Sequence, residues 1–392
     1  MIISNFKPIS TKHLFTNKKI ALVSVINDLT SDVRVNKIAQ TLIDSGYEVM
    51  LLGRLLPASK PYTSPNIKAL RMQLLFKKGP LFYFFFNLRL FFQLLFRKAD
   101  LLYANDLDTL LPNFLVAKIK GLPLIYDSHE LFCEVPELLH APFKRRIWQA
   151  LEGWIVPKLN HLITVSDGIA QFYESKYNKT FAVVRNIPPE THDAFVLKTR
   201  ADLGLPLDKK ILLLQGAGIN IDRGAEELMD AMIHVNGAVL YIIGSGDVWP
   251  VLKQKMAHPE WQNKVVLIDK LPKSELMQYT GNADVGLSID KNTNLNYYYS
   301  LPNKLFDYIA FELPILSSRL HEIEKIIQTY HIGEFIESHD PSHIAERINA
   351  FLNSDKYAVY KSNMKQAKEN LRWTKEKEKL LTVIRQAKEA DK

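Results

Sequence analysis

Short apolar runs alternate with helix-like stretches from near the start of the chain. Ile20–Val25 is continuously hydrophobic, as in a strand that is buried on both faces of a parallel sheet. A helix is predicted over Asp32–Ser45, with Asp32 or Ser31 as its N-cap and Gly46 in the left-handed conformation after its end. The same rhythm predicts further strands at Tyr47–Leu52, Leu101–Ala104, Leu124–Tyr126 and Leu162–Val165. Such alternation is typical of an α/β protein with a doubly wound parallel sheet.

A break in this rhythm follows Asn186, where the stretch NIPPETHDAF is rich in proline and polar residues, as a linker is. A second series of strands is predicted to begin at Ile211 and to continue at Val239–Gly244, Val265–Ile268, Val285–Ile289 and Ile315–Ser317. We therefore expect two Rossmann-like doubly wound parallel-sheet domains, 1–187 and 188–372, facing across a cleft. The amphipathic pattern of Trp373–Ala390 predicts a final helix, and residues 373–392 are expected to pack back on the first domain.

Composition and charge narrow the classes of partner and the compartment. A chain of 392 residues suits two domains, and its formal charge of +8 favours anionic partners. Nucleic-acid binding is discounted because no RNP, zinc-finger or basic-arm motif accompanies the charge. The single cysteine, Cys133, excludes a disulfide within the chain and favours a reducing compartment. The first residues lack the apolar core of a signal peptide, so a cytoplasmic protein is expected.

The longest apolar stretch is Leu81–Phe96, interrupted by Asn87, Arg89 and Gln93. It is shorter than the roughly 20 residues of a bilayer span, and a charged arginine at its centre would be costly there. A transmembrane helix is therefore not expected. Two alternatives stay open for residues 81–98: an interfacial helix on the inner face of the cytoplasmic membrane, or an internal helix that packs its apolar side on the sheet.

The segment NYYYSLPNKLFDYIAFELPILSSRLHE, residues 296–322, carries the strongest candidate chemistry. Pro302 suits the first turn of a helix, from which Lys304 and Asp307 would project. A lysine beside a helix N-terminus favours a diphosphate, because free N–H groups and the helix dipole both attract anions. Asp307 would accept hydrogen bonds from ribose hydroxyls. The plain alternative is a solvated pair of charges one turn apart.

Motifs along nearly the whole chain resemble those of glycosyltransferase family 4. In order, they are DVRVNKIAQTLIDSGYEV, YDSHE, ITVSDGIAQFY, VVRNIP, QGAGINIDRGAEELMDAM, YIIGSGD, KLPKSELMQYTGNADVGLS and SLPNKLFDYIAFELPILSS. The resemblance implies a GT-B enzyme that transfers a sugar from a nucleotide-diphosphate donor with retention, without a cofactor or a bound metal. The chain departs from the family's motif at its first acid, where Tyr299 stands, and shortens the second acid to Asp307. It thus resembles the branch written Pro-x-Lys-x-x-Glu-Tyr.

The resemblance assigns roles to residues of both domains. It implies that His129 faces the transferred sugar and that Arg223 and Lys304 bind the diphosphate, and these three are the expected catalytic residues. Gly216 and Gly218 would let phosphate approach the backbone. The full set of expected donor-binding residues is Gly216, Gly218, Arg223, Gly244, Gly246, Leu271, Lys304, Asp307 and Glu322.

Polar residues after the strands of the first domain form the expected acceptor side: Asp28, Arg34, Asp106, Asp108 and Glu130. The Asp-x-Asp pair is also the signature by which metal-dependent GT-A enzymes hold a cation. Those catalytic domains are single, whereas this chain has two, so no metal site is expected. HELFC lacks the second histidine of HExxH, which rejects a zinc peptidase.

The expected activity is hexosyl transfer to a saccharide or a lipid-linked saccharide, in cell-surface polysaccharide or glycan biosynthesis. A GT-B sugar-nucleotide epimerase and a catalytically silent nucleotide-sugar-binding protein stay open as alternatives.

Overall fold

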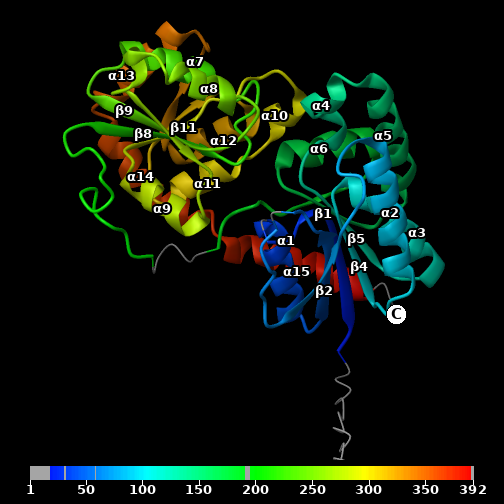
Figure 1. Ribbon diagram of the computed structural model, residues 1–392. Helices are drawn as coiled ribbons and strands as arrows, with labels where there is room; N and C mark the ends of the chain where they lie inside the picture. The colour runs from blue at the N-terminus through cyan, green and yellow to red at the C-terminus, as the bar shows by residue number, and fades with distance from the viewer. Residues whose placement is uncertain (1–17, 31, 58, 190–194, 390–392) are drawn as a thin grey trace, which may run out of the picture.

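The computed structural model describes residues 18–30, 32–57, 59–189 and 195–389, which form two α/β domains side by side (Figure 1). The sheet of the first domain is entirely parallel, with the strand order β3-β2-β1-β4-β5-β6-β7. Its strands are β1 (Ile20–Asp28), β2 (Glu48–Arg54), β3 (Ile67–Met72), β4 (Leu101–Asn105), β5 (Leu124–Ser128), β6 (His161–Thr164) and β7 (Ala182–Val183).

The sheet of the second domain is also entirely parallel and has the order β10-β9-β8-β11-β12-β13. Its strands are β8 (Lys210–Gly216), β9 (Ala238–Gly244), β10 (Val265–Asp269), β11 (Val285–Ser288), β12 (Ile315–Ser318) and β13 (Gly333–Ile336). Both orders reverse direction once, between β1 and β4 and between β8 and β11. The prediction of two doubly wound parallel sheets is therefore confirmed.

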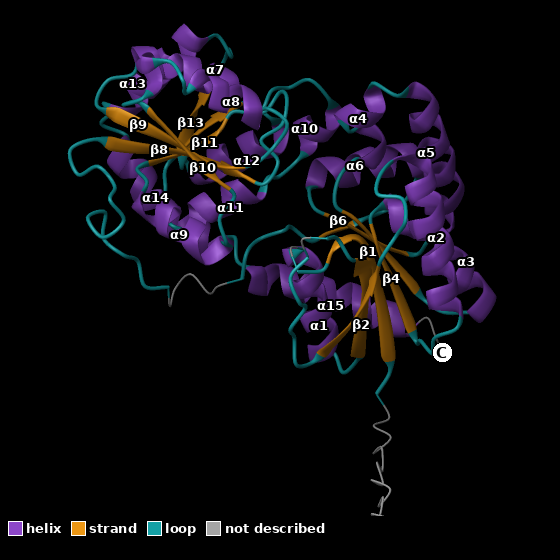
Figure 2. Ribbon diagram, viewed as in Figure 1, coloured by secondary structure: helices purple, strands orange, loops and turns teal. Residues whose placement is uncertain are grey.

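Helices cover both faces of each sheet (Figure 2). In the first domain they are α1 (Val33–Asp44), α2 (Gly79–Leu95), α3 (Leu107–Lys120), α4 (Pro136–Leu139), α5 (Pro142–Ile155), α6 (Asp167–Tyr177) and the final α15 (Trp373–Glu389). In the second they are α7 (Ala225–Ala231), α8 (Trp249–Lys255), α9 (Lys273–Asn282), α10 (Leu295–Tyr299), α11 (Asn303–Ala310), α12 (His321–Tyr330), α13 (Pro341–Leu352) and α14 (Tyr357–Asn370).

Local signals in the sequence explain how α1 begins and how the chain leaves it. The Asp32 carboxylate accepts a hydrogen bond from the Val35 N–H, as an N-cap does, while the alternative cap Ser31 lies outside the described residues. Gly46 has a φ of 92°, the left-handed conformation expected of it. Pro302 is the N-cap of α11 and not, as predicted, a residue of its first turn.

The final helix, α15, packs against α1, β6 and β7 of the first domain, and Trp373, Leu380 and Ile384 are buried there. The chain thus passes between the domains twice, after Ile187 and before Trp373. Lys37 of α1 touches both passages: its Nζ donates to the Ile187 carbonyl at 2.5 Å and lies 4.3 Å from the centre of the Trp373 ring. Burial, followed by the nearby charge of Arg34, lowers the pKa of Lys37 to about 7.

Candidate functional site

The polar residues of the site follow the strands at which each sheet reverses its order. Asp106 comes directly after β4 of the first sheet, and Asp290 comes two residues after β11 of the second. In doubly wound sheets this is the position where ligands bind, because the loops on either side of the reversal diverge and leave a crevice. The site therefore has one half in each domain.

His129 is held in the first half by Asp106. The His129 N–H donates to Asp106 Oδ1 at 2.8 Å, and its ring Nδ1 lies 3.0 Å from Asp106 Oδ2. Asp106 has a φ of 61° and a ψ of 166°, a conformation that a residue with a side chain rarely adopts. The backbone strain is compatible with a role for Asp106 in fixing the orientation of the imidazole.

A second carboxylate, that of Asp127, lies beneath the same imidazole. Asp127 is fully buried, and Arg34 forms a bidentate pair with it at 3.0 and 2.7 Å. His129 Nε2 is 3.6 Å from Asp127 Oδ2 and has no hydrogen-bond partner among the described residues. Burial alone would lower the pKa of His129, but Asp106 and Asp127 outweigh it and raise the pKa to about 10. The ring is therefore an imidazolium at neutral pH, held between the carboxylates of Asp106 and Asp127.

Two further acids gather around Asp106. Burial, followed by the charges of Asp106 and Glu130, raises the pKa of Asp108 well above its usual value, and the buried Asp108 Oδ1 has no hydrogen-bond partner in the part of the chain that is described. Burial and then Asp106 raise the pKa of Glu130 to about 7. The first half of the site thus concentrates acidic groups around one cationic histidine.

Basic groups converge in the second half of the site. Arg223 Nη1 lies 3.3 Å from Asp290 Oδ2, and Lys304 Nζ lies 3.4 Å from Asp290 Oδ1. Asp290 is fully buried, and the Arg223 guanidinium also stacks on the Tyr297 ring at 4.0 Å. Burial, aided by the nearby Arg223, lowers the pKa of Lys304 although Asp290 opposes this. Two cations share one carboxylate, so an excess of positive charge remains here.

Asp307 lies one helical turn after Lys304, and both of its carboxylate oxygens already accept hydrogen bonds. Gln215 Nε2 donates to its Oδ2 at 2.8 Å, and Lys273 Nζ donates to its Oδ1 at 2.5 Å. Gln215 is itself held by Thr280, whose hydroxyl donates to the Gln215 side-chain oxygen at 2.7 Å. A ligand that binds Asp307 would have to compete with Lys273, which is about half exposed.

The expected donor glycines fall into two kinds. A Cβ on Gly216 or Gly218 would meet side chains only at 3.6 and 3.7 Å, so these positions border open space. A Cβ on Gly244 would lie 1.8 Å from the Gly216 carbonyl oxygen, and one on Gly246 would lie 2.1 Å from that of Ile219. Gly244 and Gly246 are therefore required for the contact between two loops. Leu271, half-buried after β10, packs on the second domain's core.

Two residues expected on the acceptor side instead bind other residues of the first domain. Asp28 accepts hydrogen bonds from Thr30 and Ser59 and pairs with Arg71 at 3.1 Å. Arg34 is only 3% exposed, and besides its pair with Asp127 it donates to the Val184 carbonyl at 2.8 Å. Its buried guanidinium stabilises Asp127 and is not free to bind an acceptor substrate.

Glu322 lies where the two domains touch. It is buried, and its Oε1 accepts a hydrogen bond from the Gly168 N–H of the first domain at 2.6 Å. The Tyr299 carbonyl accepts a second interdomain bond, from Ser166 Oγ at 2.8 Å. Gly168 is needed at this contact, because a Cβ there would lie 2.2 Å from Tyr299 Cδ1. Through its contacts with the described residues, Glu322 joins the interface and not the group around Arg223.

Asn296 makes a third interdomain contact, beside His129. Its side-chain oxygen accepts from the Leu131 N–H at 3.0 Å, and its Nδ2 donates to Glu130 at 3.2 Å. The helix α10 therefore reaches across to the loop that carries His129 and Glu130.

A pocket of about 380 Å³ lies between the two halves of the site. His129 and Arg34 line it from the first domain, and Pro302 and Asn303 line it from the start of α11, next to Lys304. No three His, Cys, Asp or Glu side chains within the described ranges are arranged to hold a metal ion. The pocket brings the imidazolium of His129 and the N-terminus of α11 to one cavity.

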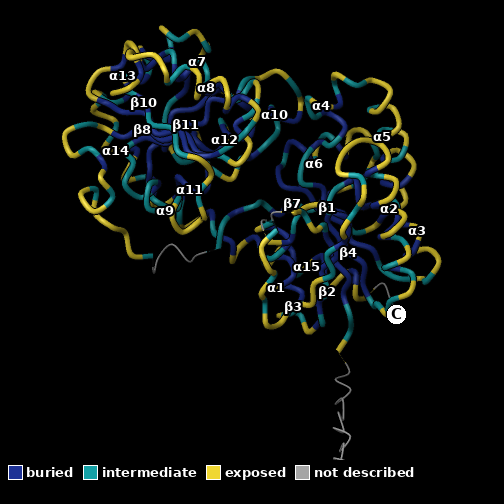
Figure 3. The backbone as a smooth tube through the Cα atoms, viewed as in Figure 1, coloured by how far each residue is buried: buried dark blue, intermediate teal, exposed yellow. Residues whose placement is uncertain are grey.

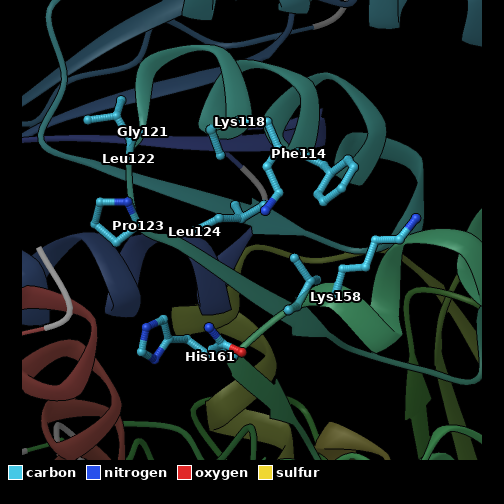
Figure 4. A pocket seen from close by; sticks show the side chains of 11 residues that line it. Phe114, Lys118, Gly121, Leu122, Pro123, Leu124, Lys158 and His161 are labelled. Carbon is cyan, nitrogen blue, oxygen red and sulfur yellow. The ribbon is translucent and has the colours of Figure 1, made fainter.

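Another pocket, of about 410 Å³, lies at the amino ends of the strands of the first sheet (Figure 4). Leu124 and His161, which begin β5 and β6, line it together with Lys118 and Lys158. Ligands of doubly wound sheets bind beyond the carboxyl ends of the strands and not at this end. The interdomain pocket is therefore the candidate site.

Sequence reasoning missed Asp127, Asp290, Gln215 and Lys273. Asp127, Gln215 and Asp290 lie in or near the end of strands that were predicted, but the partners of these residues are far along the chain: Asp127 pairs with Arg34 across 93 residues, and Gln215 with Asp307 across 92. The one available signal was that Asp127 and Asp290 are acids at the ends of apolar strands.

Two family models match the chain, one over each domain. Glycosyltransferase Family 4 matches residues 32–189, and Glycosyl transferases group 1 matches residues 197–386. No protein with curated annotation has a significantly similar sequence. The family resemblance in the motifs is thus supported over both halves.

Solved structures share the same architecture at low sequence identity. Sucrose-phosphate synthase from Thermosynechococcus elongatus has a TM-score of 0.78 at 15% identity, covering 94% of this chain and 99% of that one. HepE from Anabaena, in complex with UDP and glucose, has a TM-score of 0.72 at 13% identity, covering 94% and 100%. WaaG, a glycosyltransferase involved in lipopolysaccharide biosynthesis, has a TM-score of 0.64 at 14% identity, covering 89% and 95%. With two family models that together span both domains and this shared fold, the chain belongs to the glycosyltransferases of GT-B type.

Proposed function

We propose that the protein transfers a hexosyl group from a nucleotide-diphosphate sugar, with retention at the anomeric carbon, to a saccharide or lipid-linked saccharide acceptor in cell-surface polysaccharide or glycan biosynthesis. The observation that carries the proposal is the convergence of Arg223 and Lys304 on Asp290 beside the N-terminus of α11. Two cations with one carboxylate between them leave net positive charge where free N–H groups also attract an anion. A diphosphate fits this charge.

The two cations would act on the leaving group. As the bond between the sugar and the nucleoside diphosphate breaks, negative charge grows on the diphosphate oxygens. Arg223 offers a planar fork of N–H donors to those oxygens, and Lys304 offers a compact charge. Because this charge increases towards the transition state, its stabilisation raises the rate and not only the affinity.

His129 would orient the sugar from the other half of the site. Its Nδ1 is held by Asp106 and its buried Nε2 lies 3.6 Å from Asp127, while the residue lines the interdomain pocket. The positive charge of the ring would attract a sugar hydroxyl oxygen in the pocket. We assign no carboxylate nucleophile, and retention would then follow from attack by the acceptor on the same face that the diphosphate leaves.

The family neighbours support a uridine nucleotide as the first donor to test, since HepE is described in complexes with UDP and with UDP-glucose. Thermal unfolding of the protein would be followed with UDP-glucose, GDP-mannose and ADP-glucose. A true donor at 100 times its dissociation constant stabilises the folded state by about 2.7 kcal/mol. Loss of the shift in Arg223→Ala, with an unchanged melting temperature without ligand, would support the assignment; no shift with any donor would contradict it.

Product analysis separates the remaining activities. Proton NMR of the product of transfer reports the anomeric configuration directly, and an inverted product would overturn retention. Epimerised donor formed without acceptor would identify an epimerase instead. Donor binding without turnover on any saccharide or lipid-linked saccharide would identify a silent binding protein, in which Tyr299 replaces a required acid.

A further inference from the structure

Three neighbouring helices lie on the side of the first sheet away from α1 and α15 (Figure 1). They are α2, α3 and α5, and aromatic contacts join them. Tyr83 of α2 packs edge-on against Trp148 of α5 at 5.3 Å, and Phe114 of α3 packs against Trp154 of α5 at 5.4 Å. Their outward faces therefore form one continuous surface.

The outward face of α2 is apolar, which is unusual for a helix exposed to water. Phe82, Phe86, Leu90 and Leu94 are buried against the core, as one face of a packed helix should be. The opposite face carries a second apolar stripe at helical spacing: Leu81, Phe84, Phe85, Leu88, Phe92 and Phe96, each more than 40% exposed. The helix is thus apolar on both sides, and although Phe76 stacks on Phe85 at 5.3 Å, the outward stripe stays largely exposed.

The neighbouring helices extend this stripe. On α5, Phe143, Ile147 and Trp154 are 75%, 55% and 46% exposed and recur on one face, and on α3 Ile119 is 62% exposed. Figure 3 shows exposed segments along this side of the domain. Apolar side chains that gather on one surface indicate a site of contact with a partner, whereas scattered ones do not.

Basic residues border the apolar stripe, and acidic ones are excluded from it. Between Glu48 and Asp100 the sequence has nine Lys and Arg and no Asp or Glu. The exposed basic residues at the stripe are Lys77, Lys78, Arg89, Lys98, Lys144 and Arg146. Within the described ranges, none of these six side chains forms an ion pair with a carboxylate. Their charges are therefore available to an anionic partner.

We propose that the surface formed by α2, α3 and α5 docks on a lipid bilayer that contains anionic headgroups. Phenylalanine and leucine side chains would enter the boundary between headgroups and acyl chains, and the lysines and arginines at its edge would meet the headgroups. No helix in the described part of the chain is long and apolar enough to cross a membrane, so the contact lies in the interface plane. A second copy using the same face would bring like charges together, which argues against a symmetric dimer here.

The docking surface is connected to the candidate site. Phe132, three residues after His129, packs against Trp148 of α5 at 5.0 Å. A bilayer held on α5 would therefore lie beside the loop that carries His129 and Glu130. On the proposed function, this position would present an acceptor that is anchored in the bilayer; docking itself does not depend on that function.

Flotation of the full-length protein with vesicles tests the proposal. Vesicles of phosphatidylcholine alone are compared with vesicles that contain phosphatidylglycerol as about a third of the lipid. We expect at least about tenfold stronger binding to the anionic vesicles, and weaker binding as salt is added. Phe84→Ser/Phe92→Ser should reduce binding to both, whereas Lys144→Glu/Arg146→Glu should remove the preference for phosphatidylglycerol.

Matched variants on the second domain serve as controls. Val251 and Val359 are 45% and 53% exposed there, and Val251→Ser/Val359→Ser should leave flotation unchanged, as should Lys361→Glu/Lys365→Glu. Thermal unfolding with and without UDP-glucose shows that each variant folds and reports donor binding separately. Failure of the wild-type protein to float with anionic vesicles would overturn the proposal, as would equal losses in the controls. A dimer that the Phe84→Ser/Phe92→Ser variant dissociates, without vesicle binding, would show a protein interface instead.

Discussion

Asp106 holds His129 at two atoms, accepting from its backbone N–H at 2.8 Å and lying 3.0 Å from its ring Nδ1. One side chain thus fixes both the position of the loop and the orientation of the ring. Asp106 does so from a left-handed backbone conformation that favours glycine, so the strain is retained where it positions His129.

Replacing Asp106 by asparagine should impair His129 without removing it. An asparagine oxygen can still accept from the His129 N–H, but the negative charge that raises the pKa of the ring is lost. We expect turnover to fall by at least about tenfold, because a misplaced group in the site slows the reaction. The alkaline limb of the pH–rate profile should also move to lower pH. Asp208→Asn, on an exposed turn, is the control, and an unchanged profile in Asp106→Asn would contradict the positioning role.

The pKa of His129 also predicts how stability depends on pH. Because the folded protein holds this proton up to about pH 10 and a free histidine loses it near 6.5, the folded state binds more protons between these values. The contribution of His129 is therefore full below about pH 6.5 and is lost as the pH rises towards 10. It amounts to a few kcal/mol at most by the order of magnitude of such shifts.

Comparison of urea unfolding of the wild-type protein and His129→Gln from pH 6 to pH 10 measures the contribution of His129 to stability. The difference in unfolding free energy should shrink as the pH rises. The wild-type curve alone would not reveal the contribution of His129. The lowered pKa of Lys37 makes the folded state more stable as the pH rises over much of the same range. A difference that stays constant across the range would contradict an imidazolium at His129.

On the proposed function, Arg223→Ala and Lys304→Ala should each reduce turnover by about 100-fold or more, since each removes charge that would stabilise the leaving group. Both side chains are partly exposed, so the folded state should tolerate their loss. Steady-state rates with the donor found by thermal shift are compared with those of Arg385→Ala, which changes an arginine on the surface of α15. Wild-type rates in either variant would remove the diphosphate assignment.

Gly168→Ala tests the contact between the domains. The added methyl group would lie 2.2 Å from Tyr299 and 2.9 Å from the Glu322 carboxylate, so the interface must open or shift. We expect a loss of about 1–3 kcal/mol in stability and a larger radius of gyration by X-ray scattering. Gly153→Ala is the control, because a Cβ in α5 would meet only Tyr177 at 3.9 Å and alanine favours a helix by about 1 kcal/mol. Equal stability of both variants would show that the domains do not meet at Gly168.

The fold was predictable where local signals and buried strands agree. Ile20–Val25 and Ile211 onward lie in strands that are buried on both faces, so an uninterrupted apolar run identifies them. The edge strand β3 was missed because its residues, IKALRM, are partly exposed and carry two charges. The strand β13, Gly333–Ile336, was also missed, because its first two residues are partly exposed and one of them, Glu334, is charged.

The site was less predictable, because its geometry depends on contacts between distant segments. Lys304 and Arg223 could be named from their motifs, but only the fold brings them to a shared Asp290. Asp28 and Arg34 follow a strand as ligand-binding residues do, yet in the folded chain they meet Arg71 and Asp127. No local pattern distinguishes a polar residue that faces a ligand from one that supports its neighbour.

Lys37 occupies the place where the polypeptide crosses from one domain to the other in both directions, touching Ile187 on the way out and Trp373 on the way back. We therefore expect rotation of one domain relative to the other to pivot near this side chain. Atoms should then be displaced further the more distant they are from Lys37. The mouth of the interdomain pocket would widen or narrow most, while the core of α1 stays still. An uncharged Lys37, favoured above about pH 7, would loosen this pivot.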